Sequence, residues 1–216
     1  MKRRWMVVGL TCIALMGAAI IVRTERENRQ LAKRAAAYRI RADQGDAKAQ
    51  LTLGWMYYYG KGLPKDYVEA ARWYRKSADQ GDAKAQVTLG SLYYDGEGLP
   101  KDYVEAARWY RKSADQGNAR AQHSLGFMYH HGQGVSQDDA EAVRWYRKSV
   151  EQGYPKAQYN LGYMYYYGYG VPRDRVEAVR LFQQAAAQGD QYAKRALACD
   201  RRGISIDPGA GLRGLQ

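Results

Sequence analysis

The chain has 216 residues, two cysteines and a formal net charge of +12. The positive charge is concentrated at the start: residues 1–45 hold ten Lys/Arg and three Asp/Glu, whereas residues 46–199 hold 21 and 17. A nucleic-acid-binding domain would carry its basic stripe on the folded part of the chain, so this distribution argues against nucleic acid as a partner. The two cysteines, at positions 12 and 199, exclude a disulfide framework in the residues between them.

The first segment predicts a membrane helix. An uncharged apolar stretch over residues 5–22 follows the basic residues 1–4, and eighteen helical residues cover about 27 Å, near the lower limit for crossing a bilayer. This stretch is longer than the apolar region of a typical cleaved signal peptide, which favours an uncleaved anchor and leaves a signal peptide as the alternative. Residues 23–33 are interpreted as a basic linker.

Two charge patterns disagree about the orientation of this helix. Seven basic residues follow it between positions 23 and 41, and a literal count places the C-terminal side in the cytoplasm. A short basic N-terminus before an apolar run is, however, the usual export signal. We favour export and expect a single-pass membrane protein whose repeat domain is periplasmic or otherwise extracytoplasmic.

Glycine recurs every 36 residues, at positions 45, 81, 117, 153 and 189. A period of this length is typical of a solenoid, in which each unit buries its apolar face against its neighbours. The remaining residues, 200–216, show no period and are expected to be a disordered tail. The predicted boundaries are four full repeats over 46–81, 82–117, 118–153 and 154–189, with half-repeat caps over 34–45 and 190–199.

Each repeat predicts two antiparallel helices. In the first repeat, Asp46 is the expected N-cap of the first helix and Gly60 ends it. Asp66 and Glu69 have the spacing of a capping box for the second helix, which ends at Gly81. The expected buried residues are Ala49, Leu53, Met56 and Tyr57 on the first helix, and Ala70, Trp73, Tyr74 and Ala78 on the second.

This pattern resembles the Sel-one-like repeat family, relatives of the tetratricopeptide repeats, over residues 34–199. The residues that carry the resemblance are Ala49, Leu53, Gly54, Tyr57, Gly60, Gly62, Leu63, Ala70, Trp73, Tyr74, Ala78, Gln80 and Gly81. The resemblance implies an all-α, right-handed superhelical solenoid of antiparallel helix pairs, without a cofactor, whose members mostly act as adaptors in membrane-associated or extracytoplasmic complexes. A cysteine-rich bacterial branch is associated with β-lactam or peptidoglycan-fragment binding, so a protein that binds or hydrolyses such compounds is the alternative; the cysteine pair of that branch is missing here.

Comparison of the four repeats identifies three columns that vary together, at positions i, i+4 and i+8 on one face of each first helix. By resemblance to tetratricopeptide-like solenoids, this face lines the concave groove. Its content of aromatic residues is typical of an interface core, with simple drift of exposed positions as the alternative. The columns are Leu51, Val87, His123 and Tyr159; Trp55, Ser91, Phe127 and Tyr163; and Tyr59, Asp95, His131 and Tyr167.

Two basic patterns accompany these columns. Lys48, Lys84, Arg120 and Lys156 lie in the first turn of each first helix, where the helix dipole disfavours a cation. Either neighbouring cap carboxylates compensate, or the column contacts carboxylates of a ligand. Arg72, Arg75, Lys76 and their copies form a basic face of the second helix that is interpreted as solvated, with attraction to anionic lipid or an acidic partner as the alternative.

The sequence contains no pattern typical of catalysis. His123, His130 and His131 lie on one helix at spacings that do not chelate a metal well, and the Gly-x-Gly turns join helix to helix, unlike phosphate-binding loops. We therefore predict a non-enzymatic, membrane-anchored scaffold that binds a partner protein or extended peptide in its concave groove, without metal or small-molecule cofactor.

Overall fold

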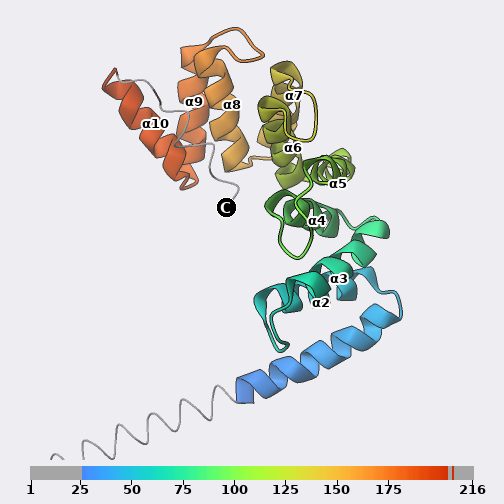
Figure 1. Cartoon of the computed structure of the whole chain (residues 1–216). Coiled ribbons are helices and arrows are strands. Elements are labelled where there is room, and N and C mark those ends of the chain that lie inside the picture. The colour runs from blue at the N-terminus through green and yellow to red at the C-terminus, as the bar shows by residue number, and fades with distance from the viewer. Residues whose placement is uncertain (1–25, 204–205, 207–216) are drawn as a thin grey trace, which may run out of the picture. The chain divides into compact units, whose positions relative to one another are not determined.

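The computed structural model describes residues 26–203 and residue 206, and every regular element in them is a helix (Figure 1). The chain divides into two compact units, Met1–Gln80 and Gly81–Gln216, which are described separately. The membrane helix predicted over residues 5–22 lies outside the described residues. None of the helices within them is both long enough and apolar enough to cross a membrane.

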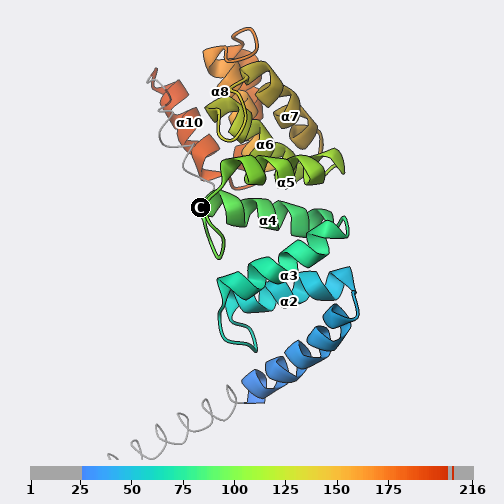
Figure 2. The same ribbon diagram turned by 45° about the vertical axis from the view of Figure 1, so that its right-hand side comes forward.

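The first unit contains one complete repeat and the helix that precedes it. A helix over residues 26–43 is followed by α2 (Ala47–Tyr59) and α3 (Tyr67–Asp79), which pack against each other as a pair (Figure 2). Residues 26–33 of the basic linker predicted over residues 23–33 are therefore helical and continuous with the residues that follow. The loop of the repeat supports these extra turns: a Cβ on Gly62 would lie 2.5 Å from the carbonyl of Leu31, so loop and helix are in close contact.

The second unit contains three helix pairs and a closing helix. Within each repeat the two helices pack together, and each second helix also packs against the first helix of the next repeat. The predicted all-α repeat of helix pairs is thus confirmed for the described residues. The helices are α4 (Ala83–Asp95), α5 (Tyr103–Asp115), α6 (Ala119–His131), α7 (Asp139–Glu151), α8 (Pro155–Tyr167), α9 (Arg175–Ala187) and α10 (Gln191–Arg201).

The helix ends largely follow the predicted capping residues. The side chain of Asp46 accepts from the backbone N–H of Ala49, and Gly60 closes α2 in the left-handed region with φ +65°. Asp66 caps α3 as expected. In a capping box the Glu69 side chain would accept from the Asp66 N–H in return, but that N–H donates to the Tyr57 carbonyl at 3.0 Å and Glu69 pairs with Arg72. The capping-box prediction is therefore only half right.

The two helices of each repeat meet where an aromatic ring lies on a helical glycine. A Cβ on Gly126 would lie 2.9 Å from the ring of Tyr146. Carbon atoms in a packed core do not approach so closely, so only glycine admits the ring at this depth. The same contact joins Gly54 to Tyr74, Gly90 to Tyr110 and Gly162 to Phe182, at 2.8, 2.7 and 2.8 Å.

Repeated hydrogen bonds fix the register of these pairs. Ser113 Oγ donates to the carbonyl of Ala83 at 2.7 Å, which ties the end of α5 to the start of α4. Gln152 Nε2 donates to Gln122 Oε1 at 2.8 Å, and Gln122 in turn donates to the Ala114 carbonyl of the preceding repeat at 3.3 Å. Helix α6 is therefore held both by α7 and by α5.

The end of the chain departs from the predicted disordered tail. Helix α10 runs to Arg201, and Asp200 pairs with Arg175 of α9 at 2.7 Å. Ile206 lies outside any helix yet is only 3% exposed, because it packs into the apolar cluster of the last repeat. The prediction is wrong for residues 200–203 and for Ile206, where tertiary contacts replace the missing periodicity.

Candidate binding surface

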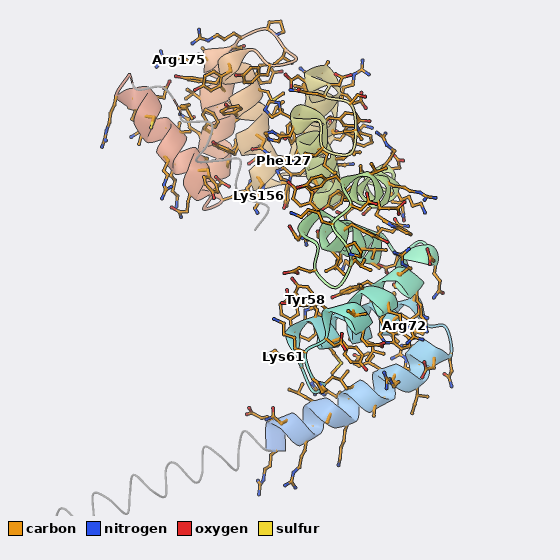
Figure 3. The ribbon with its side chains drawn as sticks, viewed as in Figure 1. Tyr58, Lys61, Arg72, Phe127, Lys156 and Arg175 are labelled. Atoms are coloured by element: carbon orange, nitrogen blue, oxygen red, sulfur yellow. The ribbon has the colours of Figure 1, made fainter. Side chains whose placement is uncertain are left out.

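The twelve residues of the three variable columns form what we call the variable stripe. In the first unit its aromatic members are accessible: Trp55 is 46% and Tyr59 is 55% exposed, and Leu51 is half-buried. The two rings lie 5.2 Å apart, and Tyr59 also contacts the ring of Tyr58, which Figure 3 labels on α2. This unit thus presents an exposed aromatic cluster on α2.

In the second unit, five members of the stripe are buried, so the expectation of a surface freed from packing is wrong for them. These side chains fill the space between the first helices of neighbouring repeats. Phe127, for example, contacts Tyr94 of the preceding repeat, with ring centroids 6.4 Å apart. The residue type at these positions therefore varies between repeats because each side chain packs against different neighbouring residues. The five are Val87, His123, Phe127, Tyr159 and Tyr163.

His123 shows how specific this fitting is. Its ring is buried, and its Nε2 lies 3.0 Å from the side-chain amide nitrogen of Asn160 on the next first helix. That nitrogen is a donor, so Nε2 accepts and the ring proton is on Nδ1. Burial, followed by the positive charges of Lys156 and Arg120, lowers the pKa of His123 to about 3, so the ring is neutral at physiological pH.

The three histidines have separate surroundings. His130 Nδ1 lies 2.5 Å from the carboxylate of Asp139, whereas His131 stacks against Phe127. Burial, with a smaller contribution from His130, lowers the pKa of His131 to about 4. Within residues 26–203 and at 206, no three His, Cys, Asp or Glu side chains are grouped so as to hold a metal ion.

A tyrosine cluster closes the stripe in the last full repeat. The rings of Tyr163 and Tyr167 lie 4.8 Å apart, and Tyr167 stacks on Tyr169 at 5.7 Å. Tyr169 is 39% exposed and was missed by the sequence comparison because it lies in the loop. The equivalent loop position varies between repeats as strongly as the stripe does, and this variation could have identified Tyr169 from the sequence. The four residues at this position are Lys61, Glu97, Gln133 and Tyr169.

Polar side chains of α4, α5 and the start of α6 meet at Ser91. Arg120 Nη2 donates to Ser91 Oγ at 3.2 Å, and the Tyr110 hydroxyl donates to the same oxygen at 3.1 Å. Asp95 is exposed, but partial burial of its carboxyl, followed by the charge of Glu97, raises its pKa. The stripe of this unit therefore offers charged and hydroxyl groups where the first unit offers aromatic rings.

The basic column of the first helices is accessible except at its last member. Lys48, Lys84 and Arg120 are exposed, whereas Lys156, which Figure 3 labels on α8, is half-buried. The cap carboxylate of Asp46 forms an ion pair with Arg41 at 2.5 Å, so it is already engaged by another cation. Tyr154 caps α8 without a side-chain hydrogen bond. A role in ligand contact remains a prediction for this column.

The basic face of the second helices is used in packing. Lys112 Nζ lies 4.1 Å from the ring centroid of Trp109, and equivalent contacts join Lys76 to Trp73 and Lys148 to Trp145. Arg108 pairs with Glu105 at 3.3 Å. Arg72, Arg108 and Arg144 are exposed, so this face is solvated as predicted, while its lysines also lie against tryptophan rings.

These features define a class of protein, an all-helical repeat scaffold. The model of the Sel1 repeat matches residues 47–82, 83–118, 119–154 and 155–190. These matches cover more than half of the chain, so the chain belongs to the Sel1 repeat family, as the sequence predicted. Proteins of this family are repeat scaffolds typically used for protein interactions, and they are generally non-catalytic.

Two solved structures are similar over most of the chain. A Sel1 repeat protein from Oxalobacter formigenes is 36% identical with a TM-score of 0.75, covering 85% of this chain and 75% of that one. A protective antigen present in uropathogenic Escherichia coli strains, which displays an SLR fold, is 38% identical with a TM-score of 0.74 over 84% of this chain. This chain spans only 40% of the E. coli protein. The comparison with curated proteins gives no match.

The buried His123 predicts a pH-dependent stability. Its pKa is about 3 in the folded chain, against 6.5 for an unperturbed histidine. As the pH falls below 6.5, the unfolded chain binds a proton that the folded chain excludes, so stability is full above pH 6.5 and falls by about 1.4 kcal/mol per pH unit below it. His123→Gln retains an acceptor for Asn160 but cannot titrate. Urea unfolding at pH 7 and pH 5 should show about 2 kcal/mol more loss for the wild type than for this variant; equal losses would contradict the neutral buried ring.

Proposed function

We propose that this chain is a membrane-anchored adaptor whose Sel1 repeats lie outside the cytoplasm and bind an extended segment of a partner protein along the exposed part of the variable stripe. The family supplies the scaffold role. The uncharged stretch over residues 5–22, preceded by basic residues, supports the anchor and the export. The accessible members of the stripe support the place of binding.

The observation that carries the proposal is the exposed aromatic cluster on α2. Other large aromatic side chains lie in the packing frame, among them Trp73, Tyr110 and Phe182, each 3% exposed or less. Trp55 and Tyr59 are half exposed and touch each other. An accessible, mutually contacting tryptophan and tyrosine gain most when a partner covers them, because Trp and Tyr dominate the energetics of protein interfaces.

The second unit adds polar specificity to this proposal. Asp95 of the stripe and the neighbouring Arg120 present opposite charges, and Ser91 lies beside Arg120. Charged groups at the edge of an interface fix the register and exclude wrong partners more than they add affinity. A partner segment that places charged residues against the second unit would match Asp95 and Arg120.

Site-specific photo-crosslinking in the expressing cells tests the proposed surface. A photoreactive phenylalanine analogue at position 55 should give adducts of discrete mass, whereas the same analogue at position 68 should not. Val68 is the matched control because it is 64% exposed on α3 of the same unit. Tyr59→Ala should lower the yield at position 55 several-fold. Equal adducts at both positions would contradict a role for the stripe.

A topology reporter tests the proposed location. A reporter that is active only outside the cytoplasm, fused after Arg202, should be active and should sediment with membranes. Deletion of residues 5–22 should abolish both properties. A silent reporter on the intact chain, with an active cytoplasmic reporter at the same position, would show that the basic residues after the span decide the orientation.

A further inference from the structure

The variable stripe of the last full repeat is occupied by the chain's own Ile206. This residue is 3% exposed although it lies in a non-helical segment beyond α10. It shares an apolar cluster with Tyr159, a stripe residue, and with Phe182 of α9. A second stripe residue, Tyr167, donates its hydroxyl to the Ile206 carbonyl. The side chain of Ile206 thus packs with Tyr159, and its backbone carbonyl is hydrogen-bonded by Tyr167.

This combination is the chemistry by which a protein surface holds a peptide. The aliphatic side chain enters an aromatic and alanine-lined site, while a tyrosine hydroxyl satisfies a backbone carbonyl that would otherwise be desolvated. Every residue has a backbone carbonyl, so the hydrogen bond from the tyrosine hydroxyl does not depend on the sequence of the peptide. The apolar site, in contrast, selects for an aliphatic side chain. Nothing in these two contacts requires that the peptide belong to the same chain.

Space remains beside Ile206 for more of a bound segment. A cavity of about 280 Å³ is lined by Ile206 itself, by Tyr192, Arg195 and Cys199 of α10, and by Arg202 at the end of that helix. Arg195 and Arg202 are both exposed, so they place positive charge at this site. In the sequence, Ile206 is followed by Asp207. The residue order of the chain itself is therefore an aliphatic residue next to an acidic one.

We infer that Tyr159, Tyr167 and the α10 cavity form a peptide subsite for an aliphatic residue followed by an acidic residue, and that Ile206 is its resident occupant. The inference rests on the proposed function, since it names the ligand class for one end of the stripe. A partner segment of this class must displace Ile206, so the contacts of Ile206 set a threshold for binding.

Binding of a labelled peptide in trans tests this inference. The probe is a fluorescent peptide with the sequence of residues 203–210, measured by anisotropy with the full chain in detergent. Ile206→Asp empties the subsite and should bind the peptide at least tenfold more tightly than the wild type, in which the tethered copy competes at a high effective concentration. A peptide in which Asp replaces the isoleucine that corresponds to Ile206 should not bind. A scrambled peptide that keeps the Ile-Asp pair should bind within a few-fold of the original.

Matched hydroxyl deletions separate the subsite from general stability. In the Ile206→Asp chain, Tyr167→Phe should weaken peptide binding roughly three- to tenfold, as expected for one lost hydrogen bond. Tyr94→Phe is the control, because it also removes a hydroxyl hydrogen bond, to Gln133 at 2.8 Å, in the same unit. Circular dichroism should show unchanged helix content, and Ile206→Ala serves as a second emptied variant.

Equal peptide binding by the wild type and both emptied variants, or no binding to either emptied variant, would overturn the inference. Binding of the chain's own peptide without the scrambled one would also overturn it, because Ile206 would then be only a structural cap. These failures would leave the crosslinks at position 55 intact, whereas failure of the proposed function would remove those crosslinks.

Discussion

The contact between an aromatic ring and a helical glycine determines the geometry of every repeat. Because Gly54, Gly90, Gly126 and Gly162 have no Cβ, the ring from the second helix reaches the backbone of the first. The two helices are thereby held at one separation and one register, which the Ser113 hydroxyl and its equivalents reinforce. In the second unit, repetition of the helix pair every 36 residues packs each second helix against the helix that follows it, and the variable stripe lies on the first helices.

The variable stripe contains both buried and accessible side chains. Where neighbouring first helices approach each other, bulky side chains fill the gap, and each is fitted to its neighbour, as His123 is to Asn160. Where the gap ends, side chains such as Trp55 remain accessible. Repeats with the same packing frame thus carry different surfaces, because the side chains in these columns differ from one repeat to the next.

Local features could be predicted from the sequence, and features that depend on neighbours could not. Asp46 begins and Gly60 ends helix α2 through contacts with residues only a few positions away, so their roles can be predicted from the sequence of one repeat. Trp55 and Phe127 occupy the same column, yet one is exposed and the other buried, and only the residues packed around them decide which. Variation between repeats looks the same in both cases. The helical turns over residues 26–33 and the burial of Ile206 were missed for the same reason, since both depend on contacts with residues distant in sequence.

A double-mutant cycle on Gly126 and Tyr146 tests the central physical claim most directly. Helix propensity alone predicts that Gly126→Ala stabilises the chain by up to about 1 kcal/mol. The close approach of the Tyr146 ring predicts instead a loss of about 1–3 kcal/mol from overpacking. Urea unfolding should show this loss in the wild-type background and its disappearance or reversal in Tyr146→Leu, where the ring is gone. The same effect of Gly126→Ala in both backgrounds would contradict the claim that the ring requires the glycine.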